Sequence, residues 1–287
     1  MTTLRIAGVP EHFNLPWILG LERRAFVRAS IDLQWRTVPE GTGAMCDLLR
    51  AGEVDMAVLV TEGAVRDILN GNPSRIISNY VDSPLTWGVH VGAATTLRTP
   101  ADLVHVPFAI SRPNSGSHLV AMGYAKKLGW QPQEKDFVVV HNLKNAVARL
   151  QEKEPLVFLW DAAMTSPFVD QGLLRRVDSY APPWPCFVVV ARESIIQEEA
   201  GAIRRALKVM HDQARGLMAK KQAPEMIAHR YGMSLAAAQE WFRTVRWNVD
   251  GNVDQQALAA VQDNLTTLGM SAPENARNPV ELSARLD

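Results

Sequence analysis

The sequence predicts an α/β protein of two lobes, in which mixed sheets are flanked by helices and a helical tail follows at the C-terminus. Three observations predict this fold. Short apolar, β-rich runs alternate with segments of helical period from the N-terminus onward. The alternation restarts after Asn72-Pro73, and from Glu193 onward the strand pattern stops. Residues 80–89 and 180–187 are the candidate chain crossings between the two halves.

The lobes follow from these crossings. We expect residues 1–84 and 187–287 to form the first lobe, and residues 85–186 to form the second. A chain of 287 residues is long enough for two compact units. Ligands of such sheets bind at the carboxyl ends of strands, beside helix N-termini, so we expect a ligand cleft between the lobes.

In the first half, strands and helices alternate regularly. The predicted strands lie at residues 4–9, 31–35 and 54–60, and the predicted helices at residues 16–26, 43–49 and 63–69. Gly52 stands where a left-handed residue would end its helix, and Gly71 ends the next one.

After the restart, the predicted strands lie at residues 76–77, 85–91, 107–110, 136–140, 156–160, 173–177 and 187–190. The predicted helices lie at residues 117–128 and 146–150, and in the tail at residues 203–217, 236–247 and 258–268. Thr99 to Asp102 has the form of a helix start, with a threonine cap, a proline in the first turn and an acid three residues on.

Composition excludes several classes of function. Thirty basic and thirty acidic side chains cancel, which argues against a nucleic-acid partner or an anionic membrane surface. No apolar run reaches the ~18 residues of a membrane span, so we expect no membrane insertion. Histidine spacing fits no metal motif, and phosphate-loop, dinucleotide and nucleophile-elbow patterns are missing. We therefore predict no metal and no cofactor.

Two features bear on the cellular compartment. Cys46 and Cys186 are the only cysteines, which argues against a disulfide framework but leaves open whether they pair. The first residues run straight into a strand without the basic and apolar regions of a secretory leader. We expect a cytoplasmic protein, or a periplasmic one if a leader has been removed.

Four stretches carry a resemblance to a known family. They are LRIAGVPEHFNLP, EGTGAMCDLLRAGEVDMAVLVTEG, SRPNSGSHLVAMGYAKKLGW, and LVFLWDAAMTSPFVDQGLLRRVDSY followed by WPCFVVVARESI. In order and spacing, the chain resembles type II periplasmic-binding-protein-like domains over residues 4–195, in the branch of nitrate-, sulfonate- and thiamine-precursor-binding components. The resemblance implies a small-molecule binder whose two lobes close on its ligand, and an ABC permease as a partner if the protein is exported. The similar eukaryotic thiamine-pyrimidine synthases carry a cysteine-rich iron motif that this chain lacks, so that chemistry is not assigned.

The first candidate site segment follows the first strand. Glu11 and His12 offer hydrogen-bonding groups, and Phe13 offers a ring face for stacking. Asn14 completes the segment. The alternative is that Asn14 only caps the next helix and Glu11 is solvated; the position after a strand favours a ligand contact.

Two further segments combine small residues with a helix N-terminus. Thr42 and Gly43 could present a hydroxyl and backbone N–H groups to a carboxylate, a phosphate or a polarised ring atom. Thr61 and Glu62 form a similar segment after the third strand. An ordinary capped helix start explains the first segment equally well, because caps that contain glycine are common. It is also a strong alternative for the second segment, because an acid in a first turn is stabilised by the helix dipole.

The serine-rich segment before residues 117–128 is the strongest candidate. Ser115 and Ser117 offer hydroxyls, and Gly116 permits a close approach of the backbone. Arg112 and His118 flank them. One capping side chain would be enough for the helix, so the surplus favours a bound ligand over a generous N-cap with a solvated arginine.

The last candidates are aromatic. Trp160 with Asp161 could stack on and accept a hydrogen bond from an N–H-bearing ring, and Trp87 could add a second stacking face. The alternative is that these tryptophans fill the core.

These residues lead to one functional hypothesis and two rivals. We expect a non-catalytic binder of a polar, heteroaromatic molecule such as a thiamine-pyrimidine-like compound. One rival is an enzyme of the same fold, related to menaquinone-pathway or thiamine-precursor enzymes, with Glu11, His12 or Asp161 as acid or base. The other is a sulfonate- or nitrate-binding transporter component. The hypothesis requires that the candidate turns converge on one hollow.

Overall fold

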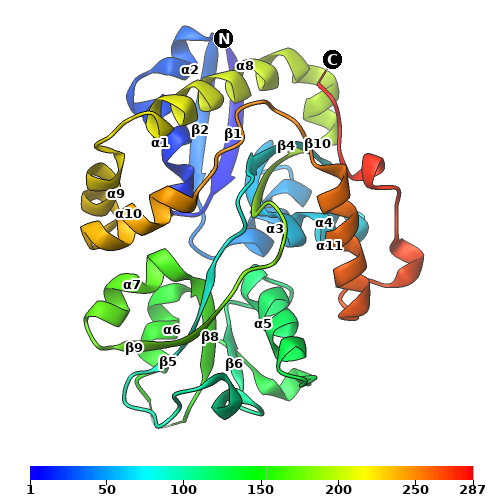
Figure 1. The fold of residues 1–287 in the computed structure, drawn as a ribbon. Coiled ribbons are helices and arrows are strands. Elements are labelled where there is room, and N and C mark those ends of the chain that lie inside the picture. The colour runs from blue at the N-terminus through cyan, green and yellow to red at the C-terminus, as the bar shows by residue number, and fades with distance from the viewer. Residues whose placement is uncertain (153, 287) are drawn as a thin grey trace. The chain divides into compact units, whose positions relative to one another are not determined.

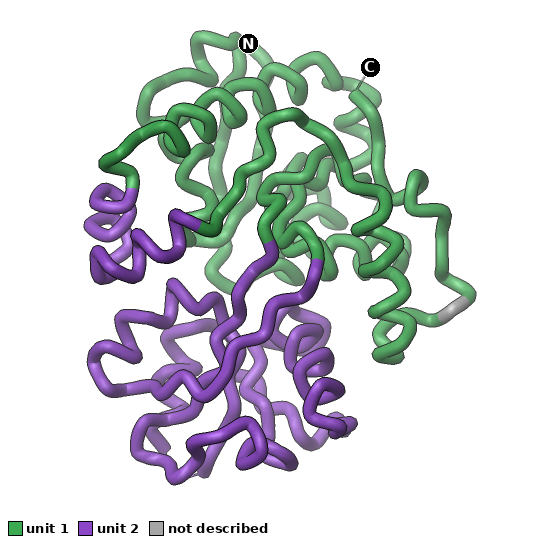
Figure 2. Tube along the Cα trace, in the orientation of Figure 1, with its two compact units in different colours: residues 1–83, 184–223, 244–287 green, residues 84–183, 224–243 purple. Residues whose placement is uncertain are grey.

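The computed structural model describes residues 1–152 and 154–286. They form two compact units, shown in separate colours in Figure 2. Unit 1 comprises Met1–Ser83, Trp184–Ala223 and the stretch from Thr244 onward, and unit 2 comprises Pro84–Pro183 and Pro224–Arg243. The lobe boundaries expected from the sequence stay a prediction.

Unit 1 is built on a mixed sheet in the order β2-β1-β3-β10-β4 (Figure 1). Its strands are β1 (Thr2–Gly8), β2 (Ile31–Thr37), β3 (Met56–Val60), β4 (Ser74–Val81) and β10 (Phe187–Arg192). β1 pairs in parallel with β2 and β3, whereas β10 is antiparallel to both β3 and β4. All of β3 is buried, which explains its continuous apolar run.

Unit 1 contains both α-helices and short 3₁₀ helices. They are η1 (His12–Asn14), α1 (Leu15–Glu22), α2 (Ala25–Arg28), α3 (Thr42–Arg50), α4 (Thr61–Leu69), α8 (Glu193–Met218), α11 (Gln255–Thr267), η4 (Pro273–Asn275) and η5 (Pro279–Leu282). Gly52 follows α3 with φ +70°, as predicted for a residue that ends a helix in the left-handed region.

One predicted helix of unit 1 is wrong in its extent. Residues 16–26 form no single helix, because Arg23 ends α1 and Arg24 has a left-handed backbone with φ 53°. The chain restarts as the short α2. The apolar period continues through the break, since Trp17 and Phe26 are both buried and stack with ring centroids 5.9 Å apart.

Unit 2 has a sheet of the same plan, in the order β7-β6-β8-β5-β9. Its strands are β5 (Trp87–Gly92), β6 (Phe108–Ile110), β7 (Phe137–Val139), β8 (Val157–Asp161) and β9 (Leu174–Tyr180). β6 pairs in parallel with β7 and β8, and β5 is antiparallel to β8 and β9. The predicted mixed sheets flanked by helices are therefore confirmed.

The helical elements of unit 2 include two that come from the C-terminal part of the chain. They are η2 (Pro100–Leu103), α5 (Gly116–Lys127), η3 (Glu134–Asp136), α6 (Leu143–Arg149), α7 (Ala162–Asp170), α9 (Ala223–Tyr231) and α10 (Leu235–Thr244). The helix start predicted at Thr99 is confirmed: Thr99 and Asp102 form a capping box before a short 3₁₀ helix.

A buried carboxylate paired with two partly exposed arginines joins strands of unit 1. Asp55, which precedes β3, accepts bonds from Arg5 Nη2 at 2.6 Å and Arg192 Nη2 at 2.8 Å. The hydrogen bonds from both arginines hold the pKa of Asp55 below its usual value against the effect of burial. The carboxylate thus joins β1, β3 and β10.

The described residues contain neither a disulfide nor a membrane-spanning helix. Cys46 and Cys186 are both buried, and no disulfide joins them. Within residues 1–152 and 154–286, no helix is both long enough and apolar enough to cross a membrane.

Candidate ligand-binding turns at the strand ends

The turn after β1 is held tightly within unit 1. Glu11, His12, Phe13 and Asn14 are all buried. Asn14 occupies the N-cap position of α1, but its side chain makes no capping bond. Its amide instead donates to the carbonyl of Val9 at 2.8 Å and so closes the turn. Gly8 makes this packing possible, because a Cβ there would lie 2.3 Å from the Trp35 ring and 2.9 Å from the Asn14 amide.

Phe13 anchors this turn to the core of unit 1. Its carbonyl oxygen accepts from Tyr80 Oη at 2.5 Å and from Trp247 Nε1 at 2.9 Å. Its ring packs against Phe187 at a centroid distance of 4.8 Å, and His12 contacts it edge-on at 4.7 Å. Burial lowers the pKa of His12 to about 3, so its imidazole is neutral at ordinary pH.

The N-terminus of α3 uses its hydroxyl inside the protein. Thr42 Oγ1 accepts from the backbone N–H of Val60 at 3.2 Å, which ties α3 to the end of β3. Its methyl group lies against Gly63, where an added Cβ would come within 2.5 Å of Thr42 Cγ2. Gly43 follows Thr42 and is half-buried. A hydroxyl that accepts one bond still keeps its hydrogen, so a ligand contact by Thr42 stays a prediction.

The junction of β3 and α4 is also bonded within unit 1. Thr61 donates its hydroxyl hydrogen to the carbonyl of Pro185. Glu62 Oε2 accepts from the indole N–H of Trp184 at 3.1 Å, and both side chains are buried. Burial raises the pKa of the Glu62 carboxyl, against the hydrogen bonds that lower it. Each of these groups has a structural role.

The serine turn lies between β6 and α5 in unit 2. Ser115 is the N-cap of α5, and its Oγ accepts from the N–H of His118 at 3.3 Å. Ser117 Oγ accepts from the N–H of Ser111 at 2.9 Å. It also lies 3.0 Å from Ser115 Oγ and 3.2 Å from Ser111 Oγ. All three serines are at least 97% buried.

A count of hydroxyl hydrogens shows what this turn can still do. Three hydroxyls share two oxygen–oxygen contacts, and each contact uses one hydrogen. One hydroxyl hydrogen is therefore left over within the turn. If Ser117 donates to Ser115, the oxygen of Ser115 accepts two bonds and its own hydrogen points elsewhere. The surplus noted in the sequence thus mostly holds the turn together and leaves one donor.

Arg112 and His118 flank the serines. Arg112 is half-buried, and its buried Nη2 atom has no hydrogen-bond partner among the described residues. His118 Nδ1 accepts from the N–H of Asn114 at 2.9 Å, and its ring lies edge-on to Phe137 at 4.4 Å. Asn114 takes the left-handed conformation, with φ 65°, in this turn. Gly116 begins α5.

The aromatic candidates lie at the corresponding end of β5 and β8. Trp87 is the first residue of β5 and pairs with Asp161 in the sheet. Trp160 stacks on Phe158 at 5.4 Å and packs against the core of unit 2, as expected for a core-filling tryptophan. Asp161 Oδ1 accepts from the N–H of Met164 at 2.7 Å and caps α7. Burial raises the pKa of Asp161 to about 7 despite this bond.

Sequence reasoning gave no ligand-site role to two residues that build these turns. Tyr80 holds the carbonyl of Phe13, and Trp184 donates to Glu62. Ser111, which completes the serine cluster, lies in the serine-rich segment that the sequence already indicates and directly follows the apolar run of β6. Tyr80 and Trp184 give no local signal, since their partners are 67 and 122 positions away in the chain.

Each candidate ligand-binding residue therefore lies at one end of the sheet of its own unit. This is the end at which the parallel strands of that sheet have their carboxyl termini. The expectation that the candidates of both units face one ligand stays a prediction. Among residues 1–152 and 154–286, no group of three or more His, Cys, Asp or Glu side chains could hold a metal ion.

Comparison with known proteins agrees with this architecture. Residues 87–180 match the family model of the Ca3427-like periplasmic binding proteins. The CA3427 gene product of Candida albicans, which has the generic periplasmic binding protein fold, is 25% identical. The match covers 98% of this chain and 94% of that one, with a TM-score of 0.89.

Two further structures share the fold at lower identity. The alkanesulfonate-binding protein SsuA of Xanthomonas axonopodis pv. citri, bound to MOPS, is 15% identical over 99% of both chains, with a TM-score of 0.80. The periplasmic nitrate-binding protein NrtA of Synechocystis is 13% identical over 96% of this chain and 84% of that one, with a TM-score of 0.73. The curated proteins contain no match.

Proposed function

Because residues 87–180 match the model of the Ca3427-like periplasmic binding proteins and the chain shares the fold of such proteins, we propose that it binds a small polar organic molecule at the strand-end turns. The observation that carries the proposal is the buried serine turn of unit 2. Its three hydroxyls satisfy one another except for one hydrogen, and that hydrogen can be donated to an acceptor atom of a ligand. The turn lies at the carboxyl end of a central strand, where ligands of α/β sheets bind.

The finer proposal concerns the class of ligand. The candidate turns offer a hydroxyl donor from the serines, the neutral imidazole of His12 and a carboxyl group at Asp161 whose pKa is near neutrality. Such a set suits a neutral or zwitterionic heteroaromatic molecule, such as a thiamine-pyrimidine-like compound, better than a bare inorganic anion.

A sulfonate or nitrate ligand, delivered to an ABC permease, is the second candidate. The names of SsuA and NrtA, which share the fold, favour it. The backbone N–H groups at the start of α5 would bind the anion.

A calorimetric titration separates these candidates. We expect an aminopyrimidine with a hydroxymethyl group to bind at micromolar concentration, and alkanesulfonates and nitrate to bind at least about tenfold more weakly. The reverse order would favour the second candidate. If no pyrimidine, sulfonate or aromatic acid changes the titration heat or the melting temperature, the binding proposal is wrong. Mass spectrometry of the incubated ligand tests the enzyme alternative, because a new product would contradict a pure binder.

A matched pair of serine variants tests the serine turn. Ser115→Ala should weaken ligand binding about tenfold, because it removes a buried donor. Ser234 is the control, since its hydroxyl also accepts an N–H bond at the start of a helix, α10, but follows no strand. Ser234→Ala should change the affinity less than about twofold. Equal losses in the two variants would show that the serine turn only stabilises the fold.

A further inference from the structure

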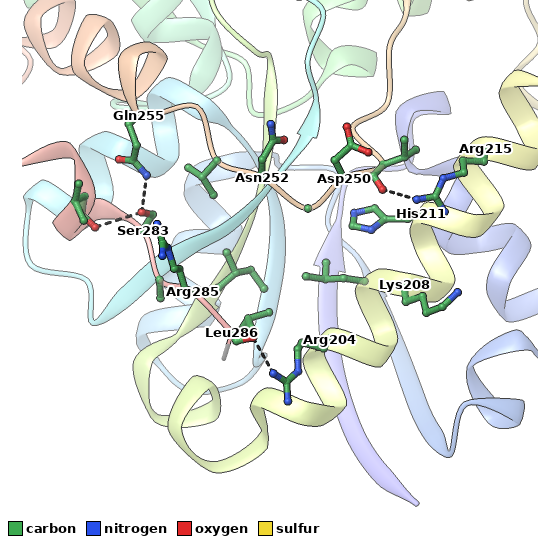
Figure 3. A pocket seen from close by; sticks show the side chains of 17 residues that line it. Arg204, Lys208, His211, Arg215, Asp250, Asn252, Gln255, Ser283, Arg285 and Leu286 are labelled. Carbon is green, nitrogen blue, oxygen red and sulfur yellow. Dashed lines mark hydrogen bonds between the residues drawn. The ribbon is translucent and has the colours of Figure 1, made fainter.

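Unit 1 contains a pocket that none of the candidate turns lines. Its volume is about 830 Å³, within the range of small-molecule sites. Figure 3 shows how three distant segments form it: α8, the stretch Val249–Gln255, and the C-terminal stretch from Val280. All of them belong to unit 1, so the pocket is complete in that unit.

The charged side chains that line this pocket are mostly cationic. They are Arg204, Lys208, Arg215 and Arg285, against the single carboxylate of Asp250. The whole chain, in contrast, balances thirty basic residues with thirty acidic ones. The pocket is therefore a local excess of positive charge in a protein without net charge.

Contacts within the pocket leave part of this charge uncompensated. Asp212, beside the pocket on α8, pairs with Lys208 and with Arg215, each at 2.8 Å. Arg204 bonds to the backbone carbonyl of Leu286 at 3.0 Å, which carries no net charge. Within the described part of the chain, no carboxylate pairs with Arg204 or Arg285. These two guanidinium groups are therefore available to an anion.

A buried imidazole lines the same pocket. His211 is 7% exposed, and its Nε2 atom has no hydrogen-bond partner in the described residues. Burial, aided by Arg215, lowers the pKa of His211 to about 4, so the ring is neutral and can donate one N–H. Gln255 Oε1 is a second buried atom without a partner on this pocket. Unsatisfied buried polar atoms are uncommon in native proteins, and a bound molecule would satisfy them.

The remaining wall is apolar. Ile77 of β4 and Leu207 of α8 are buried, and Val249, Val253 and Val280 line the pocket with them. A hydrated inorganic anion would gain nothing from these side chains, whereas a hydrocarbon or aromatic body would cover them.

We propose that this pocket is a binding site for an amphipathic organic anion, with its carboxylate near Arg204, Arg285 and His211 and its apolar body against the valine and leucine side chains. The site is independent of the strand-end turns. It would give the protein a second ligand of a different chemical class.

Titration with three probes tests the chemistry of the site. We expect octanoate to bind with one equivalent per chain, and acetate and octanol to bind at least about tenfold more weakly, because each has only one half of the required chemistry. Octanoate binding should weaken as sodium chloride is raised, since the cations are partly exposed. The proposal is wrong if octanol binds as tightly as octanoate, or if octanoate does not bind.

Charge variants locate the site. Arg285→Glu should weaken octanoate binding about tenfold, and Lys220→Glu less than about twofold. Lys220 is a suitable control because it is exposed, follows α8 and does not line the pocket. His211→Phe keeps a ring of similar volume, loses the N–H and should weaken binding about fivefold. Equal effects of the two charge reversals would overturn the proposal.

One further variant separates this site from the proposed function. Ser115→Ala should leave octanoate affinity unchanged, because Ser115 lies in unit 2. If Ser115→Ala weakens octanoate and Arg285→Glu does not, octanoate binds at the strand-end turns and the second site does not exist.

Discussion

The junctions of β3 with α4 and of β8 with α7 occupy the same place in their two sheets, and in both the helix begins directly after the strand. Each carries a buried carboxyl group whose pKa is raised by burial, Glu62 in unit 1 and Asp161 in unit 2. They differ in how the carboxyl group is held. Glu62 accepts from the indole of Trp184, far away in the chain, whereas Asp161 caps its own helix.

A second pair of turns differs in the same way. The hydroxyl oxygen of Thr42 accepts a hydrogen bond from a backbone N–H of β3, which is a tertiary contact, whereas the serines before α5 bond to one another and to their own helix. The polar groups at the strand ends of unit 1 therefore mainly join elements together. Those of unit 2 mainly shape their own turn, and one donor is left over.

The largest effect expected from this comparison is a pH dependence at Asp161. Its pKa is about 7 in the folded protein and near 3.8 in the unfolded chain, so the folded state holds the proton more tightly. This contribution to stability is complete below about pH 3.8 and is lost as the pH rises through about 7. The wild type should lose up to about 1.4 kcal/mol of stability per pH unit relative to Asp161→Asn, which keeps the cap without a charge.

Urea unfolding of both proteins across this pH range measures the difference. Parallel pH profiles for wild type and Asp161→Asn would mean that Asp161 titrates at its ordinary value. Its burial would then have no electrostatic consequence.

The next effect is expected at Thr42. Thr42→Val keeps the shape of the side chain but leaves the buried N–H of Val60 without an acceptor, and should cost about 1–3 kcal/mol of unfolding free energy. Thr42→Ser keeps the acceptor and should cost less. Chemical denaturation compares them, and equal stability of the valine and serine variants would contradict the role assigned to the hydroxyl.

Ser115 should show a smaller loss of stability. Ser115→Ala removes an N-cap and should cost about 1 kcal/mol of unfolding free energy. Ser234→Ala, which removes the corresponding bond at an exposed helix start, should cost a similar amount or less. Thermal unfolding tests both variants. A loss above about 3 kcal/mol at Ser115 would show that the serine cluster supports the whole unit.

The smallest effect is expected at Glu62. Glu62→Gln keeps an oxygen that can accept the indole N–H of Trp184, and removes a carboxyl group whose charge burial disfavours. Its unfolding free energy should stay within about 0.5 kcal/mol of wild type. Because the chain has eight tryptophans, the emission of Trp184 is taken as the difference from a Trp184→Phe background, and a large shift of that difference in folded Glu62→Gln would mean that the bond is lost.

The helix starts and ends that the sequence predicted well are determined by residues close together in the sequence. Ser115 before α5, Thr99 before η2 and Gly52 after α3 act within about one helical turn, and each is recognisable from residue type and spacing. Strand positions such as those of β3 and β10 were also predictable, because these buried strands carry apolar runs.

The parts that could not be predicted depend on tertiary partners. Nothing near Thr42 in the sequence indicates that Val60 is its donor, and nothing near Glu62 points to Trp184. The break of the first helix at Arg24 is of the same kind, since no glycine or proline marks it. The position of each candidate residue at a strand end was therefore predictable from the sequence. Its hydrogen-bond partners could be identified only from the structure.

The position of β10 has a consequence for synthesis on the ribosome. β10 lies between β3 and β4 and joins these two strands, which are complete more than a hundred residues earlier. Until residues 187–192 leave the exit tunnel, the nascent first unit exposes two unpaired strand edges, and such edges invite association with other chains. All strands of the second unit lie within Pro84–Pro183, and its remaining part, Pro224–Arg243, is helical. The sheet of the second unit can therefore be complete before β10, the last strand of the first unit, has been synthesised.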